Sequence, residues 1–252
     1  MKKFGGLGAA TAHLRHILRE VKRPANEDID PSRTHLNYSL GPKRKIKPYA
    51  YLKRRVSELH TIDREDTHVL CGWVVTKPKD LPPNEERQFF ERSYEFLKER
   101  YGGEKNVVAA EVHKDEAGEA HLHFYFVPTV GYTENANMLK VVEYFEAHPG
   151  EENISKVARE LGISRKTVRR WKGKSRADIC SEKICAKEVL NRQELCSFHP
   201  DYQEYLDRCG LHAKVHTGIT AAQGGNRTVE ELKRERDIQR ELTHEVNHEI
   251  NY

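Results

Sequence analysis

Four segments of the chain have the spacing of apolar side chains that is typical of regular secondary structure. They are residues 8–23 and 84–101, predicted as amphipathic helices, and residues 34–40 and 69–76, predicted as strands. In the second helix, Phe90, Tyr94 and Leu97 recur at helical spacing and form one apolar stripe. Residues 69–76 are apolar at nearly every position, which is typical of a buried strand.

A fifth segment, residues 107–128, has the pattern of two strands joined by a short polar loop. Small and β-branched residues end at His113, the loop contains Gly118, and an alternating run extends from His121 to Val127. Strands and helices are interspersed along the chain up to this hairpin. This order predicts an α+β fold, in which helices pack on a mostly antiparallel sheet that includes the hairpin.

Three histidines on the predicted hairpin have the spacing of metal ligands. His121 and His123 are two residues apart on one strand and therefore share a face, and His113 would lie across from them. Three converging imidazoles leave coordination positions open, as in a catalytic metal site. Asp115 and Glu116 in the loop could ligate the metal or orient an imidazole. Surface histidines on a polar strand are the alternative, and the acidic loop favours the metal site.

Composition limits the class of protein. The chain has 252 residues, of which 33% are charged and 37% hydrophobic, enough for one large or two small domains. No run approaches the ~18 apolar residues of a membrane span, and the N-terminus is not a persuasive signal peptide. Five unevenly placed cysteines indicate reduced thiols in a cytoplasmic protein. A net charge of +4 permits a nucleic-acid partner without requiring one.

Cationic residues cluster between residues 41 and 55, where no acidic residue interrupts them. Cations bind phosphates and aromatic faces stack on bases, a combination that suits single-stranded nucleic acid. A solvated helix face would have a similar composition. The predicted DNA-binding residues of this stretch are Lys43, Arg44, Lys45, Lys47, Tyr49, Lys53 and Arg54.

Three blocks of residues together resemble one protein family. The blocks are residues 16–20 (HILRE), residues 26–38 (NEDIDPSRTHLNY) and residues 113–123 (HKDEAGEAHLH). They resemble the Mob/Pre, or MobV-type, plasmid mobilization and recombination relaxases of the HUH endonuclease class. The resemblance covers residues 1 to about 130 and resumes from about residue 186. Ala120 stands where the family usually has a proline.

The resemblance implies an enzyme that nicks one DNA strand at the origin of transfer of a plasmid or mobile element and forms a covalent 5′-phosphate adduct. It implies a divalent metal ion, Mn²⁺ or Mg²⁺, on the three histidines. The family's histidine nucleophile maps to His16, whose neutral imidazole could be oriented by an acid such as Glu20, Asp28 or Asp30. The predicted catalytic residues are His16, Arg19, Glu20, Asp28 and Glu116, and Arg33 is predicted to contact DNA.

The identity of the nucleophile has alternatives. His13 lies close to His16 in the sequence, but only His16 is followed by Arg19 and Glu20 at plus three and plus four. A tyrosine nucleophile, as in other relaxases, also stays open, with Tyr38, Tyr49 and Tyr51 as candidates.

Residues 153–172 have the pattern of a helix-turn-helix. Gly162 makes the turn, Ser164 caps the second helix, and Val168 and Trp171 supply its buried face. Cations suited to phosphates and guanine edges point outward: Arg165, Lys166, Arg169 and Arg170. A hairpin used only for packing is the alternative. We predict a DNA-binding insertion at residues 134–176 within a relaxase-like domain of residues 1–133 and 177–252.

Three further possibilities depend on less specific patterns. A non-catalytic, sequence-specific DNA-binding regulator is the alternative function, although the complete histidine set favours an enzyme. A repeated C-x-x-H spacing could hold structural zinc, but it falls on or near helices that match the family; its residues are Cys196, His199, Cys209 and His212. Residues 228–252 predict a charged helix that packs on the core or self-associates.

Overall fold

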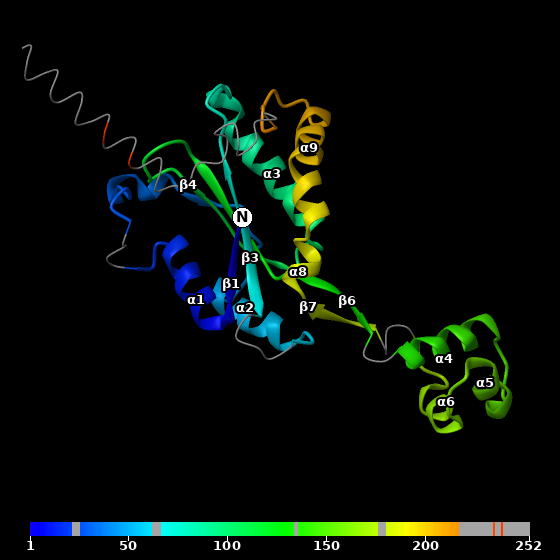
Figure 1. Cartoon of the computed structure of the whole chain (residues 1–252). Coiled ribbons are helices and arrows are strands. Elements are labelled where there is room, and N and C mark those ends of the chain that lie inside the picture. The colour runs from blue at the N-terminus through cyan, green and yellow to red at the C-terminus, as the bar shows by residue number, and fades with distance from the viewer. Residues whose placement is uncertain are drawn as a thin grey trace, which may run out of the picture. The chain divides into compact units, whose positions relative to one another are not determined.

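The computed structural model describes residues 1–21, 26–61, 67–133, 136–175 and 180–216, together with residues 234 and 238 (Figure 1). By its internal contacts the chain forms two compact units, Met1–Ala213 and Lys214–Tyr252. The C-terminal helix predicted at residues 228–252 lies outside the described residues, except for residues 234 and 238, which are helical. No helix in the described ranges is long and apolar enough to cross a membrane.

The first unit contains a five-stranded sheet and a two-stranded sheet. In chain order its elements are β1 Lys2–Gly5, α1 Gly6–Ile17, η1 Pro31–Leu36, β2 Tyr38–Ser39, α2 Pro48–Ser57, β3 His68–Thr76, η2 Pro83–Glu85, α3 Glu86–Arg100, β4 Val107–His113, β5 His121–Phe126, β6 Thr129–Thr133, α4 Ala136–Ala147, α5 Ile154–Leu161, α6 Arg165–Trp171, β7 Cys180–Ile184, α8 Ala186–Val189 and α9 Arg192–Arg208. Every pairing between these strands is antiparallel. The predicted α+β class is confirmed.

The larger sheet has the strand order β1-β3-β5-β4-β2, with the predicted hairpin β4–β5 inside it. His113 lies directly across from His121, and the pairing continues in register from there toward Phe124. Residues directly opposite in an antiparallel pair share a face, and side chains alternate along a strand. The histidines therefore point to one face, and Leu122 and Phe124 point to the other.

Helices α3 and α9 cover the face that carries Leu122 and Phe124. Figure 1 shows these two helices side by side. Tyr101, at the end of α3, stacks on Phe126 with ring centroids 4.1 Å apart, and Phe198 of α9 stacks on Trp73 of β3 at 3.9 Å. This aromatic layer buries the apolar face of the sheet and so holds in place the hairpin strands β4 and β5, whose histidines point to the other face.

Helix α1 covers part of the histidine face. Its buried residues Ala10, Leu14 and Ile17 join one apolar cluster with residues of β3 and α2. Val74 lies across from His123 on the same face and is 39% exposed. The packed end of this face anchors α1, while Val74 beside the histidines stays partly exposed.

The predicted helix at residues 8–23 is wrong at its end, because α1 stops at Ile17. Arg19 adopts a left-handed backbone conformation with φ of 55°, where a non-glycine residue costs roughly 1–2 kcal/mol. The N–H groups of Arg19 and Glu20 donate to the carbonyls of His16 and Arg15, which closes the helix end. From this turn the Arg19 side chain reaches Asp115 and Glu116 in the loop after β4.

The predicted strand at residues 34–40 is also wrong over most of its length. Pro31 starts a 3₁₀ helix, η1, and the Asp30 side chain caps it by accepting a hydrogen bond from the Ser32 N–H. Only Tyr38 and Ser39 form the short strand β2. Local capping therefore overrides the alternating pattern in this segment.

Three helices follow one another between two paired strands. β6 pairs with β7 from Thr129↔Ile184 to Thr133↔Cys180, and α4, α5 and α6 lie between these strands in the sequence. Ser164 caps α6 by accepting from the Thr167 N–H, and Gly162 ends α5 with φ of 67°. The four cations predicted to face outward are exposed, namely Arg165, Lys166, Arg169 and Arg170.

Candidate metal centre and its supports

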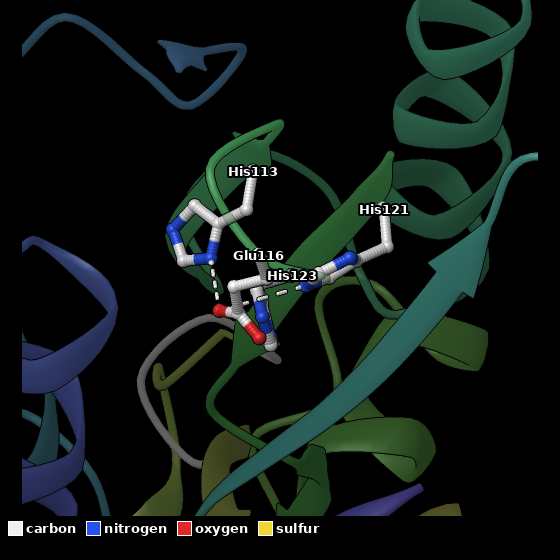
Figure 2. A group of neighbouring side chains, drawn as sticks. All are labelled: His113, Glu116, His121 and His123. Atoms are coloured by element: carbon white, nitrogen blue, oxygen red, sulfur yellow. Dashed lines mark ion pairs between the residues drawn. The ribbon is translucent and has the colours of Figure 1, made fainter. Parts of the chain in front are cut away.

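Three imidazoles and one carboxylate converge at the open end of the histidine face (Figure 2). Ligand atoms of His113, Glu116, His121 and His123 all lie within 4.8 Å of one another. The His123 ring centroid is 4.6 Å from that of His113 and 4.8 Å from that of His121. The register of β4 and β5 places the rings, and the loop after β4 turns Glu116 back toward them.

The donor set fits a divalent first-row metal ion. Imidazoles and a carboxylate suit ions such as Mn²⁺ or Zn²⁺. The four ligand atoms already lie within 4.8 Å of one another, so small side-chain movements would bring them to bonding distance of about 2.1 Å around one ion. His113 donates its Nε2 hydrogen to the Ile17 carbonyl at 2.8 Å, so Nδ1, which accepts from Arg19 Nη2 at 3.1 Å, is the nitrogen with a lone pair that a metal could take.

Arg19 ties the acidic loop together behind this group. Its guanidinium donates to Asp115 Oδ2 at 2.9 Å, to Asp115 Oδ1 at 2.6 Å and to Glu116 Oε1 at 2.7 Å. Burial alone would raise the pKa of Asp115, but hydrogen bonds from Arg19 and two other polar side chains hold it at about 2. Burial would likewise raise the pKa of Glu116, but the hydrogen bond from Arg19 and the charge of its guanidinium hold it far below its usual value. Both groups are carboxylates at neutral pH.

The polar block at residues 26–38 wraps around the same loop. The Asn26 amide donates to Glu116 Oε2 at 3.2 Å, and the Thr34 hydroxyl donates to Asp115 Oδ2 at 2.9 Å. The Asp28 carbonyl accepts from the Ala117 N–H at 3.1 Å. This segment therefore supports the metal-facing loop, and Asp28 takes part through its backbone.

His16 lies in the last turn of α1 and is half-buried, and the next residue, Ile17, accepts a hydrogen bond from His113 of the cluster. Burial and the charge of Arg19 lower the pKa of His16, and the Glu116 carboxylate opposes this only in part. Burial also lowers the pKa of His121 and, more strongly, that of His123. These imidazoles are neutral near pH 7, as metal ligands and nitrogen nucleophiles must be.

Two acids proposed to orient His16 have other partners. Glu20 pairs with Lys47 at 2.5 Å, and Asp30 caps η1 through Ser32. The end of α1 at Ile17 separates Glu20 from the helical stripe that carries His16. Among the predicted catalytic residues, the structure gathers His16, Arg19 and Glu116.

The candidate tyrosines do not share the histidine site. Tyr38 lies across from Val112, so it points to the sheet face opposite His113. Tyr51 is buried, and its hydroxyl donates to the Lys105 carbonyl at 2.6 Å. The Tyr49 ring packs against the apolar cluster beneath α1. The geometry of the cluster favours His16 over these phenols.

The predicted basic residues fall into two groups. Lys43, Lys45, Lys47, Lys53, Arg54 and Arg33 are exposed. Arg44 instead stacks on the Tyr51 ring at 3.5 Å and donates to the Val107 and Glu104 carbonyls, each at 2.8 Å. The guanidinium of Arg44 thus holds the start of β4. Among the exposed cations, Lys47 pairs with Glu20 and Arg54 with Glu58.

The C-x-x-H spacing does not assemble a zinc site in the described part of the chain. The only group of metal-type ligands found there is the histidine–glutamate cluster. Cys196 is exposed on α9, and Cys209 lies beyond the end of that helix.

Sequence reasoning missed two features of the site. It overlooked Tyr125, the next residue after His121 and His123 in their alternating series, and it treated His13 only as a rival nucleophile. The structure brings the two together, with the Tyr125 hydroxyl 2.5 Å from His13 Nε2. The one sequence signal for Tyr125 is the alternation of side chains along β5, which puts Tyr125 on the same face as His121 and His123.

A mostly antiparallel sheet that gathers three histidines and a glutamate on one face defines a candidate metal-binding α+β domain. The family described as "Plasmid recombination enzyme" (Mob_Pre) matches residues 1–161, and the chain belongs to this family.

Relatives and solved structures agree with this assignment. A plasmid recombination enzyme of Streptococcus agalactiae is 37% identical over 134 residues, which is 50% of this chain and 26% of the relative. A plasmid recombination enzyme type 2 of Staphylococcus aureus is 36% identical over 120 residues, covering 45% of this chain and 28% of the relative. The matched stretch is thus about a quarter of these relatives' length.

Among solved structures, the chain is similar to the MobM relaxase domain bound to plasmid pMV158 oriT DNA. The Mn-bound crystal structure at pH 6.8 has a TM-score of 0.59 and 25% identity, and covers 93% of this chain and 96% of the other. The Mn-bound crystal structure at pH 4.6 has a TM-score of 0.60 with the same identity and coverage. The expected Mob/Pre resemblance is confirmed.

Proposed function

We propose that this chain is a metal-dependent DNA relaxase that nicks one strand at an origin of transfer by transesterification. The observation that carries the proposal is that the last turn of α1, which contains His16, meets the metal-ligand cluster, because His113 donates to the carbonyl of Ile17, the residue after His16. The resemblance to the Mn-bound MobM domain with oriT DNA adds the substrate class and the metal. Plasmid or mobile-element DNA at such an origin is therefore the proposed partner.

The chain's own residues would act as follows. The cluster holds a divalent ion, which when bound supplies a positive charge for a phosphate oxygen. The neutral His16 imidazole attacks the phosphorus, an N–P bond forms, and the bond to the 3′-oxygen breaks. The 3′-oxygen takes up a proton, the imidazolium loses one, and the 5′-phosphate stays on His16. Arg19 keeps both loop carboxylates ionised and in place.

The exposed cations near residues 43–54 would bind the single strand on its way to this site. Their phosphate contacts require no base preference, since the charge of the backbone is the same for every sequence. We propose in addition that residues 134–176 form a DNA-binding insertion. Support comes from the capped α5–α6 pair and from the exposure of all four cations of α6.

Cleavage of a labelled single strand that contains the transfer origin, with Mn²⁺ present, tests the proposal. Wild type should form a covalent adduct, while His16→Ala and His121→Ala should not. His35→Ala is the matched control, because His35 is exposed and its Nδ1 bonds to the Ser32 carbonyl, so its adduct yield should equal wild type.

The same assay separates the enzyme from a regulator. A His16→Ala variant that still forms the adduct would contradict the histidine nucleophile. A wild type that binds origin duplex but never cleaves would favour the non-catalytic, sequence-specific regulator built on residues 134–176.

A further inference from the structure

Tyr125 lies directly behind one of the proposed metal ligands. It follows His123 by two residues on β5, so both side chains point to the same face. Tyr125 is 1% exposed, and its hydroxyl is 3.4 Å from His123 Nδ1 and 2.5 Å from His13 Nε2. The two rings of β5 are nearly parallel, with 11° between their planes. The hydroxyl therefore bridges a metal ligand on the sheet to a histidine on α1.

The surroundings hold the Tyr125 ring in this place. Tyr125 lies across from Gly72 on β3, and a Cβ at Gly72 would come within 2.2 Å of the Tyr125 ring. The ring thus crosses the strand at the one position without a side chain. On the other side, Phe4 of β1 stacks on His13 with centroids 4.3 Å apart. Both ends of the bridge are fixed by packing.

The hydrogen bonds in this bridge have one consistent direction. With His123 Nδ1 facing Tyr125, Nε2 is the nitrogen left to offer a lone pair to a metal, so Nδ1 carries the hydrogen. Nδ1–H then donates to the Tyr125 oxygen, and the phenol hydrogen donates to His13 Nε2. Burial, with the charges of Lys2 and His16, lowers the pKa of His13 to about 4, so it accepts near neutral pH.

We propose that Tyr125 is a positioning residue of the metal centre, with His13 as its anchor: together they fix the ring orientation and the tautomer of His123. The inference rests on the proposed function for the role of the metal. Residues that hydrogen-bond the far nitrogen of a ligating histidine typically change metal affinity by 10–100-fold. His13 is thereby assigned to support the cluster, which leaves the attack on phosphorus to His16.

Tyr125→Phe removes the hydroxyl and keeps the ring that fills the space over Gly72. Mn²⁺ affinity, titrated by electron paramagnetic resonance without DNA, should fall about 10-fold. Tyr94→Phe is the matched control, because Tyr94 packs on the opposite face of the sheet against Phe124, and its Mn²⁺ affinity should equal wild type. His13→Leu should match Tyr125→Phe, and His13→Gln, which keeps an acceptor, should recover most of the affinity.

The tautomer gives a readout that loss of packing would not produce. In metal-free protein labelled with ¹⁵N-histidine, long-range proton–nitrogen NMR spectra should show His123 protonated at Nδ1 in wild type and in Tyr94→Phe. Tyr125→Phe should shift the population toward Nε2–H. A wild type protonated at Nε2, or a Tyr125→Phe variant with unchanged affinity, would overturn the proposal. Neither measurement uses DNA, so a failure of nicking alone would refute the proposed function and leave this result standing.

Discussion

Asp115→Asn tests whether the buried ion pair with Arg19 stabilises the fold. The Asp115 side chain is fully buried and faces Arg19, which is itself 13% exposed. Asparagine keeps the shape of the side chain but loses its charge, so Arg19 retains only Glu116 as an ionic partner. The free energy of unfolding should fall, because hydrogen bonds to a charged acceptor are stronger than those to a neutral one.

The pKa of Asp115 sets the magnitude. A folded-state value of about 2, against an ordinary 3.8, corresponds to about 2.4 kcal/mol of stabilisation at neutral pH. Because Arg19 and Glu116 are 13% and 18% exposed, solvent screening reduces this to roughly 1–2 kcal/mol. In a chain of 252 residues, that difference lowers the melting temperature by about 2–8 °C.

The effect has a defined pH window. The folded-state pKa is depressed, so the stabilisation is fully present above the ordinary pKa and is lost as pH falls toward the folded value. Urea unfolding should show a constant deficit of the variant between pH 7 and pH 5, and about half of it at pH 3. Asp30→Asn is the control, because Asp30 is an exposed cap and asparagine caps as well as aspartate. Equal deficits for both variants, or the same Asp115→Asn deficit at pH 3 and pH 7, would refute the reasoning.

Three further predictions follow from the packing and the charges. Gly72→Ala should displace the tyrosine ring that crosses it and lower the free energy of unfolding by about 1–3 kcal/mol, whereas Gly131→Ala, with nothing within 4 Å, should change urea unfolding little. Mn²⁺ at about 100 times its dissociation constant should stabilise wild type by about 2.7 kcal/mol; chelation should reverse this in melting experiments, and His121→Ala should not respond to either. Arg169→Ala should reduce the salt slope of duplex-DNA binding by about 1, and an unchanged slope would remove that residue from the interface.

Local patterns were sufficient to predict the hairpin and its histidines. The alternation from His121 to Val127 has a period of two, which assigns each side chain to a face before any partner strand is known. The glycine-containing loop then joins the two strands as antiparallel neighbours. The pattern therefore predicts that the three imidazoles converge. It also predicts that Glu116, in the loop between the two strands, lies beside them.

Backbone conformation at single residues was not predictable. Nothing in the composition of residues 8–23 signals a left-handed Arg19, since the apolar stripe continues to Val21. The conformation persists because Arg19 gains partners in Asp115 and Glu116 that offset its strain. The four-residue edge strand β1 was missed for a related reason, because so short a segment has no periodicity to read.

The sequence by itself determined which faces the hairpin side chains occupy, because strand alternation is a local property of the backbone. Tertiary structure decided which distant residues support that face. Arg19 meets Asp115 across 96 positions of the chain, and His13 meets Tyr125 across 112. Such contacts depend on how α1 packs over β3 and β5, and helix packing depends on the shapes of both surfaces together.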